Sequence, residues 1–334
     1  MSELALTRRE VLLLGANALG LGALGLHRLG KHLEWLERAS VTVLKATDYS
    51  AKLVDIIASG LKEMGFNRDV IKGKSILLKP NFVEPTAAAI HCNTHPMFVR
   101  AVAECFMRLD AGSIIIGEGP GLSTDTTAVI EASGLLPYLD DKRLSFVDLN
   151  CDNIIKAPNV TKFTKLKKLY LPNSLVAADF VVSLPKMKTH HIAGVTLAMK
   201  NLFGCMPGIV YGWPKNLLHF AGIPGAILDI TAAIRPALSI VDGVMGMDGM
   251  GPLMGNPKKA NVLVMGKNPV AVDATCCRLM GIEPAEIAYL AVASGRLGPI
   301  KEQHIEQRGE ELNLMKVDFA RPPKSDKEGS LEGY

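Results

Sequence analysis

The sequence predicts an α/β protein in which a mostly parallel sheet carries helices on both faces, with Rossmann-like layering. From Val41 onward, short apolar runs alternate with segments of helical periodicity. Strands separated by helices favour a parallel sheet with right-handed crossovers. Hydrophobic residues make up 48% of the 334 residues, and the chain contains 31 glycines. This composition is typical of a compact globular protein with a sizeable core.

The individual elements follow from these patterns. In the first half we expect strands at 41–45, 75–78, 113–116 and 145–149, and helices at 52–64, 96–109 and 124–132. Thr94 has the residue type of a helix N-cap just ahead of the helix at 96–109. In the second half we expect strands at 180–182, 238–241 and 262–265, and helices at 194–203, 216–234, 269–280 and 284–293. The helix over 216–234 is expected to be interrupted near Gly222 and Pro224. The section from Cys151 to Leu171 is less regular, and we interpret its lysine run as a solvated face.

The chain organisation is predicted to be a single domain over 41–320, preceded by a targeting segment over 1–40. A polar tail over 321–334 is expected to be disordered. The run Thr7-Arg8-Arg9-Glu10-Val11-Leu12 resembles a twin-arginine export signal, and the apolar stretch 11–26 follows it. No A-x-A cleavage site comes soon after, so we expect a retained membrane anchor. The protein would then lie in the periplasm or on the outer face of the cytoplasmic membrane. The alternative is an N-terminal helix that packs on a partner.

Charge and cysteine content exclude some classes of function. The net charge is only +4 and aromatic residues make up 5% of the chain, so we expect no nucleic-acid binding. The six cysteines are scattered without a C-x-x-C pair. This pattern gives no support for an iron–sulfur cluster or a zinc ribbon, and the cofactor and any metal stay unidentified.

Polar residues follow four predicted strands, and parallel strands would bring them to one edge of the sheet. These residues lie in Lys79-Pro80-Asn81, Gly117-Glu118-Gly119, Lys186 to His190, and Asp242-Gly243. Lysines at such an edge suit a phosphate or carboxylate. His190 beside several cations would be pushed towards its neutral form and could act as an acid or base. A turn at Gly194 would bring Lys200 back to the same pocket.

The site predicted from these residues has a catalytic part and a binding part. The catalytic candidates are His190, Lys200 and Glu118. The candidates for binding a ligand or cofactor are Lys79, Asn81, Lys186, Lys188, Asn201, Asp242, Gly249 and Gly251. The two glycines belong to the glycine-rich stretch 243–255, which we expect to form a flexible wall or lid over the site.

Seven short motifs occur in a fixed order between Val41 and Pro299. They are Lys79-Pro80-Asn81, Thr94-His95-Pro96, Pro185-Lys186-Met187-Lys188-Thr189-His190, Lys200-Asn201-Leu202-Phe203-Gly204, Asp242-Gly243, Gly249-Met250-Gly251-Pro252 and Ala271-Val272-Asp273-Ala274. This set resembles the family called domain of unknown function 362. Many of its members carry a ferredoxin-like cluster module, whose cysteines this chain lacks.

A second, more local resemblance is to the nickel-pincer lactate racemases. It covers the run from Ala178 through His190 and Lys200 to Gly208. The resemblance implies proton transfer by His190 and a covalent link between Lys200 and a cofactor. Where those racemases place a second catalytic histidine, this chain has Glu118.

Two hypotheses for the function come from these observations. The first is an enzyme that acts on a small anionic substrate or bound cofactor, with His190 as acid or base and the lysines as an anion clamp. The second is a non-catalytic cofactor- or metal-binding protein that serves a membrane redox complex. The concentration of lysine and histidine favours the first, whereas the missing cluster module and the retained anchor favour the second.

Overall fold

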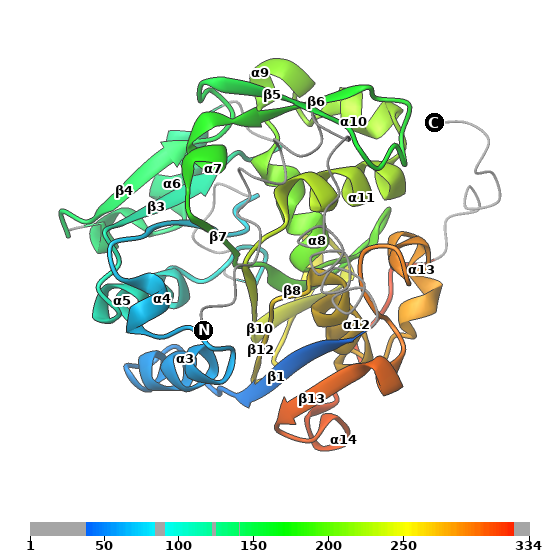
Figure 1. Ribbon diagram of the computed structural model, residues 1–334. Helices are drawn as coiled ribbons and strands as arrows, with labels where there is room; N and C mark the ends of the chain where they lie inside the picture. The colour runs from blue at the N-terminus through cyan, green and yellow to red at the C-terminus, as the bar shows by residue number, and fades with distance from the viewer. Residues whose placement is uncertain (1–37, 84–90, 122–124, 140, 324–334) are drawn as a thin grey trace, which may run out of the picture.

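The computed structural model describes residues 38–83, 91–121, 125–139 and 141–323. Within these residues the strands form one large mixed sheet and a separate two-stranded hairpin (Figure 1). The strands of the large sheet are β1 (Ala39–Lys45), β2 (Ser75–Lys79), β3 (Ser113–Glu118), β4 (Leu144–Asp148), β7 (Phe180–Ser183), β8 (Lys186–His190), β9 (Gly194–Thr196), β10 (Leu238–Met250), β11 (Met254–Lys258), β12 (Val262–Gly266) and β13 (Ile305–Gly309). The hairpin consists of β5 (Ile154–Pro158) and β6 (Lys168–Pro172).

Helices connect the strands. They are α3 (Lys52–Glu63), α4 (Arg68–Ile71), α5 (Pro96–Arg108), α6 (Thr126–Ala132), α7 (Asn173–Ala177), α8 (Ala198–Asn201), α9 (Gly208–Tyr211), α10 (Asn216–Phe220), α11 (Ile223–Ile234), α12 (Pro269–Leu279), α13 (Ala288–Ala293) and α14 (Leu312–Met315). The described residues also contain the 3-10 turns η2 (Leu136–Tyr138), η3 (Leu202–Cys205), η4 (Pro284–Glu286) and η5 (Glu302–His304).

The large sheet is mostly parallel, as expected. Its main path runs β13-β1-β12-β10-β7-β2-β3-β4. The five strands from β10 to β4 all run in the same direction, whereas β12 is antiparallel to both β10 and β1. The carboxyl ends of β2, β3, β4 and β7 therefore meet at one edge, where β10 also passes.

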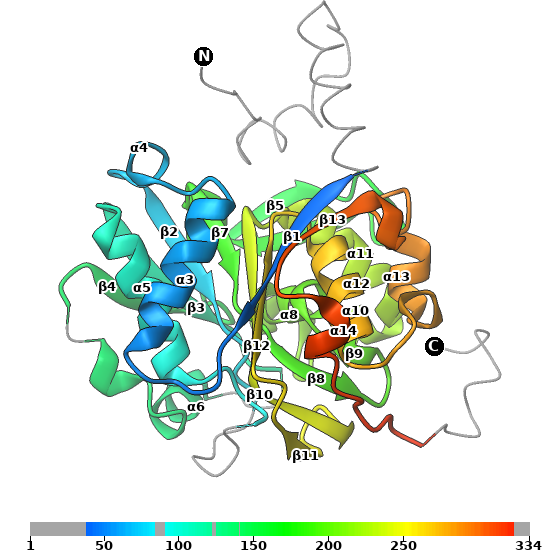
Figure 2. The same ribbon diagram turned by 90° about the horizontal axis from the view of Figure 1, so that it is seen from below.

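Both faces of the sheet are covered, which accounts for the long apolar runs in the central strands. Successive residues of β2 alternate between faces: Leu77 packs in one apolar core, and Ile76 and Leu78 pack in the other. Helices α3 and α5 cover the second face, and α11, α12 and α13 cover the first (Figure 2). The chain thus has an α/β fold with helices on both sides of the sheet.

Several helix starts follow standard capping chemistry. Asn268 caps α12 by accepting bonds from Val270 N and Ala271 N, and Pro269 occupies the first turn. The N-cap of α5 is His95, whose Nδ1 accepts a bond from Met97 N. The expectation that Thr94 caps this helix is wrong. Thr94 Oγ1 instead donates to Leu184 O and accepts from Asn81 N, which joins two loops at the edge of the sheet.

Three other expectations are also corrected. The segment 194–203 is not one helix, because β9 pairs with β8 before the short helix α8 begins. The glycine-rich stretch is ordered, since β10 continues to Met250 and pairs with β8 and β11. The irregular section after Cys151 contains the hairpin β5–β6.

The predicted export signal and anchor, and most of the predicted polar tail, lie outside the described residues. Among the residues that the structure describes, no helix has the length and apolar character needed to cross a bilayer.

Candidate functional site: a lysine-rich edge of the sheet

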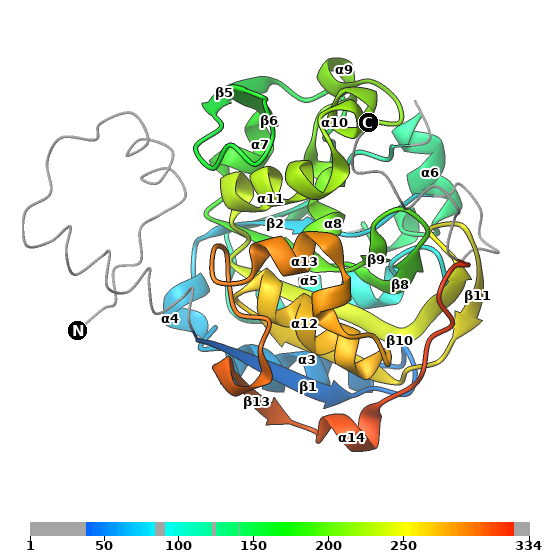
Figure 3. The same cartoon turned by 90° about the vertical axis from the view of Figure 1, so that its right-hand side faces the viewer.

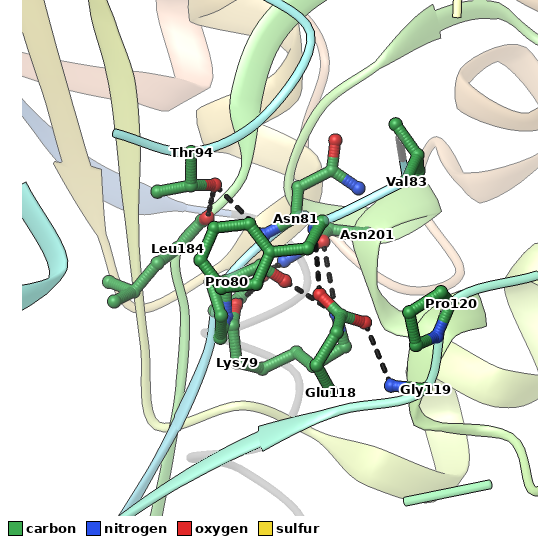
Figure 4. Close-up of polar contacts among 12 residues, drawn as sticks. Lys79, Pro80, Asn81, Val83, Thr94, Glu118, Gly119, Pro120, Leu184 and Asn201 are labelled. Carbon is green, nitrogen blue, oxygen red and sulfur yellow. Dashed lines mark hydrogen bonds and ion pairs between the residues drawn. The ribbon is translucent and has the colours of Figure 1, made fainter. Parts of the chain in front are cut away.

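Two predicted site residues, Lys79 and Glu118, form a buried ion pair at the ends of β2 and β3. Lys79 Nζ lies 2.6 Å from Glu118 Oε1, and both side chains are almost completely buried. The carboxylate also accepts bonds from Phe82 N at 2.8 Å and Gly119 N at 2.9 Å (Figure 4). Burial raises the pKa of Glu118, and the ammonium of Lys79 opposes that shift. Glu118 is thus held in place by three donors.

Asn201 joins this pair from the other side of the sheet edge. Its Nδ2 donates to Lys79 O at 2.9 Å and to Ser183 Oγ at 3.0 Å, and its Oδ1 lies 3.4 Å from Lys79 Nζ. The ends of β2, β3 and β7 are therefore joined through side chains that the sequence singled out (Figure 4). Because these groups satisfy one another, they form a rigid floor for the site.

A second buried ion pair joins Lys186 on β8 to Asp242 on β10. Lys186 Nζ lies 2.7 Å from Asp242 Oδ2 and donates to Met245 O at 3.0 Å. Tyr49 OH donates to the other carboxylate oxygen at 2.9 Å, and His95 N donates to Oδ2 at 3.0 Å. Burial lowers the pKa of Lys186, against the attraction of Asp242. This network closes the side of the site next to β10.

Lys188 is buried and has no carboxylate partner within the described ranges. Its Nζ donates to Cys92 O at 2.7 Å and Pro252 O at 3.3 Å, and both acceptors are neutral. Burial lowers the pKa of Lys188 to about 7. The positive charges of Lys186 and Lys200 act in the same direction, which shows that these lysines share one electrostatic environment.

His190 ends β8, and its ring is fixed by the turn that follows. Nδ1 accepts bonds from Ile192 N at 3.1 Å and Ala193 N at 3.2 Å. The neutral ring must then carry its hydrogen on Nε2. Burial lowers the pKa of His190 to about 2, and the charge of Lys200 adds to the shift. The predicted neutral state agrees with these contacts, but the tautomer makes Nε2 a hydrogen-bond donor rather than a free base.

Lys200 returns to the site through a reversal of the chain at Gly194, as expected. Gly194 has a φ of +78°, and β9 leads from it into α8. The side chain of Asp273 fixes the start of α8 by accepting bonds from Ala198 N at 2.7 Å and Met199 N at 3.1 Å. Asp273 is thereby a positioning residue for Lys200, which lies in the first turn that it caps.

The ammonium of Lys200 lies on an aromatic ring instead of a carboxylate. Its Nζ is 4.0 Å from the ring centroid of Phe203, and the ring of His219 lies 5.6 Å from that of Phe203. Burial lowers the pKa of Lys200 to about 8, and the charge of Lys79 acts in the same direction. A lysine with this pKa is available as a base or nucleophile near neutral pH.

The sequence analysis missed Lys215, a further buried lysine at this edge. Its Nζ donates to Asn150 Oδ1 and to Met206 O, and the side chain is 2% exposed. Burial lowers the pKa of Lys215 to about 8, while the charge of Glu118 opposes the shift. The only local signal was the turn before it, since Lys215 follows Trp213-Pro214 and has a φ of +71°.

The remaining predicted residues border the site. Asn81 lies in the loop after β2, and its Oδ1 is buried without a hydrogen-bond partner among the described residues. Gly249 O accepts a bond from Thr189 Oγ1, and Gly251 O accepts from His191 N. At Gly251 a side chain would collide with Thr189 O, so the glycine allows β8 and the end of β10 to approach closely. These two glycines belong to a wall, not to a lid.

Comparison with known proteins identifies the family. The family described as "Domain of unknown function (DUF362)" matches residues 76–278, which include every site residue described above except Tyr49. A thylakoid-associated protein of Synechocystis sp. is 30% identical over 266 residues, which cover 78% of this chain and 79% of that protein. The chain belongs to the DUF362 family.

Two solved structures show weaker similarity to this DUF362 protein. One is a Thermotoga maritima protein with a TM-score of 0.43 and 14% identity, covering 70% of this chain and 59% of that one. The other is the lactate racemase apoprotein from Thermoanaerobacterium thermosaccharolyticum, with a TM-score of 0.40 and 11% identity, covering 75% of this chain and 58% of that one. The chain thus spans less than two thirds of either solved structure.

The charges at this edge of the DUF362 domain do not balance. Glu118 and Asp242 neutralise Lys79 and Lys186. In the described part of the chain, Lys188, Lys200 and Lys215 contact neutral oxygens or an aromatic ring and form no ion pair. No group of three or more His, Cys, Asp or Glu side chains in the described residues is arranged to hold a metal ion. What this arrangement can do chemically is attract an anion and exchange a proton with it.

Proposed function

We propose that this DUF362 protein is an enzyme that binds a small anionic substrate or cofactor at the lysine-rich edge of its sheet. The observation that carries the proposal is the presence of three lysines, Lys188, Lys200 and Lys215, that have no carboxylate partner among the described residues. Each has a pKa lowered towards neutrality by burial. An anionic ligand would supply the missing negative charge and raise these pKa values.

The residues would divide the work according to their contacts. Lys188 and Lys215 would hold the charge of the ligand. Lys200, which is partly exposed and makes no hydrogen bond in the described structure, would exchange a proton with it. His190 would donate a hydrogen bond from Nε2, and the unpaired Oδ1 of Asn81 would accept one from a ligand hydroxyl or amine. The ligand class is therefore an anion that also carries a hydrogen-bond donor.

Binding can be tested through the protons that it moves. At about pH 8, an anion that raises the pKa of these lysines causes proton uptake, which appears as a calorimetric heat that changes with the ionisation enthalpy of the buffer. The probes would be inorganic phosphate and lactate, titrated into protein freed of co-purified small molecules. We expect proton uptake in the wild type and in Lys62→Met, a control for an exposed lysine of α3. Lys188→Met, Lys200→Met and Lys215→Met should each reduce it. Equal uptake in all variants, or none with either probe, would contradict the anion site.

The rival hypothesis is a non-catalytic cofactor- or metal-binding protein that serves a membrane redox complex. The name of the Synechocystis relative, a thylakoid-associated protein, supports a location beside a membrane. Intact mass spectrometry and metal analysis of natively purified protein separate the two hypotheses. A cofactor that stays bound and is not turned over favours the rival, whereas a free site that converts an added anion favours the enzyme.

Export by the twin-arginine route and retention by the N-terminal segment are part of the same proposal. Changing Arg8 and Arg9 together to lysine should leave the protein in the cytoplasm. Normal localisation of this double variant would refute the export proposal without affecting the anion site.

A further inference from the structure

A lobe at one end of the molecule is built from two separate segments of the chain, and its buried side chains join the core on one face of the large sheet. We call it the hairpin lobe. It consists of residues 150–172, which contain β5 and β6, together with α9 and α10. Tyr170 N donates to Tyr211 OH at 2.8 Å, and Ile209 N donates to Asn150 O at 3.1 Å, so the two segments are joined. Figures 1 and 3 both show these four elements gathered at one end of the molecule.

The turn between β5 and β6 is fixed to the body of the protein by one carboxylate. Asp229 of α11 is buried and accepts bonds from Phe163 N and Thr164 N, both at 2.9 Å, and from Thr161 Oγ1 at 2.8 Å. In addition, the first turn of α11 packs against Phe163 and Thr164 at Gly225. Because α10 leads directly into α11, the turn and α10 lie next to each other.

The surface of the hairpin lobe is strongly basic. Residues 150–172 contain five lysines and a single acidic residue, Asp152. The lysines are all exposed and form no ion pair in the described part of the chain; they are Lys156, Lys162, Lys165, Lys167 and Lys168. Asp152 forms no ion pair with them in the described part of the chain, and its carboxylate accepts bonds from Asn153 N and Ser174 N. The ammonium of Lys156 lowers the pKa of Lys168 across the hairpin, which reflects uncompensated positive charge.

The same lobe exposes large apolar side chains. The exposed fraction is 71% for Phe220 and 68% for Val160, and 53% for both Leu217 and Ile209. Ile154 and Ile155 are adjacent on β5, and both are exposed. Single exposed apolar residues need no explanation, but this lobe exposes six of them together with five lysines that form no ion pair in the described part of the chain.

We propose that the hairpin lobe docks on the surface of an anionic bilayer. Its lysines fit the negative headgroups, and its apolar side chains fit the boundary between headgroups and acyl chains. A nucleic acid would match the lysines but leave most of the apolar residues without a role. The lobe also adjoins the lysine-rich site, since α10 carries His219 beside Phe203. Docking would bring the part of that site around Phe203 close to the membrane surface. The inference depends neither on the N-terminal segment nor on the proposed reaction.

The chain contains a natural reporter for this surface. Cys151 lies at the start of the hairpin lobe and is exposed, whereas the other five cysteines are buried. An environment-sensitive fluorophore on Cys151 of the full chain reports contact by the lobe itself, even if another segment also binds lipid. We expect a blue shift with phosphatidylcholine vesicles that contain phosphatidylglycerol. The shift should be small with phosphatidylcholine alone and should decrease as salt is added.

Variants inside and outside the hairpin lobe distinguish docking by this lobe from non-specific adsorption of the protein to vesicles. The pair Leu217→Ser and Phe220→Ser should abolish most of the blue shift, whereas Leu314→Ser, at an equally exposed position on α14, should leave it unchanged. Lys162→Gln and Lys165→Gln should each weaken vesicle affinity about fivefold, which corresponds to about 1 kcal/mol per charge near the membrane surface. Lys72→Gln, a change in an exposed lysine outside the lobe, should have little effect.

Three results would overturn the inference. The first is an unchanged label signal on vesicles that contain phosphatidylglycerol. The second is equal loss of the signal in the lobe variants and in the controls. The third is a label signal that responds to duplex DNA more strongly than to vesicles, which would assign the lysines to nucleic-acid binding instead.

Discussion

Neutralising Glu118 provides the sharpest test of how the edge of the sheet is held together. In Glu118→Gln the side chain keeps its size but loses its charge, and Lys79 Nζ stays buried with only neutral acceptors, namely Pro80 O, Asn201 Oδ1 and the new amide oxygen. The two carboxylate oxygens accept bonds from different backbone N–H groups, Phe82 N and Gly119 N. An amide can accept at only one of these positions, so one N–H also loses its partner.

The expected magnitude follows from the burial of this pair. Removing one partner of a buried ion pair leaves an uncompensated charge and typically costs about 3–5 kcal/mol, whereas exposed pairs contribute about 0–1 kcal/mol. The assay is urea unfolding at neutral pH, with the free energy of unfolding compared between variants. Asp110→Asn is the matched control, since it makes the same chemical change in the exposed pair Arg68–Asp110, where the Arg68 side chain is 64% exposed.

A second variant separates charge from hydrogen bonding. Adding Lys79→Met to Glu118→Gln removes the unpaired ammonium and should recover part of the lost free energy. If Glu118→Gln costs no more than Asp110→Asn, the reasoning about buried charge at this site is refuted. If the double variant recovers nothing, the loss comes from the backbone N–H groups alone.

Two predictions concern the pH dependence of stability. Burial lowers the pKa of Lys188 to about 7. Between about pH 7 and pH 10 the unfolded chain therefore binds more protons than the folded chain. In the ligand-free protein the free energy of unfolding should then rise with pH over this range. The urea concentration at the midpoint of unfolding should therefore increase between about pH 7 and pH 10, and it should increase less in Lys188→Met than in the wild type. A midpoint concentration that falls equally in both proteins would contradict the prediction. Burial raises the pKa of Asp273 to about 7. Between about pH 4 and pH 7 the folded chain therefore binds more protons than the unfolded chain. For this reason Asp273 should make the free energy of unfolding fall as pH rises through this range. Asp273→Asn should flatten that part of the pH profile, and an unchanged profile would show that Asp273 does not titrate there.

The positions of the strand ends could be predicted because they depend on local pattern and on one topological rule. Short apolar runs in the sequence predicted β2, β3, β7 and the start of β10. Parallel strands then bring their carboxyl ends together at one edge of the sheet. Lys79, Glu118 and Asp242 were therefore placed correctly at one edge without knowledge of the strand order. The return of Lys200 was also predictable, since Gly194 supplies the positive φ that the chain reversal needs.

The features that the sequence did not predict, β9, α8 and the burial of Lys215, depend on contacts between residues far apart in the chain. Val195 and Thr196 are β-branched, yet the helical spacing of the residues after them suggested a helix over 194–203. Pairing with β8 draws these residues into β9, and the carboxylate of Asp273, 75 residues away, then starts α8. Lys215 had no sequence signal of its own, because it follows a turn rather than a strand. Its burial depends on Asn150, which is 65 positions away in the chain.

The composition of the sequence also concealed the charge imbalance that supports the proposed function. A net charge of +4 over 334 residues suggests no special affinity for anions. The structure buries or partly buries five lysines at one edge of the sheet, and among the residues it describes only two carboxylates are in direct contact with them. Burying an ammonium without a counterion costs several kcal/mol, so a fold does not gain stability by keeping Lys188, Lys200 and Lys215 there. Under the proposed function, the negative charge of a bound ligand would offset this cost.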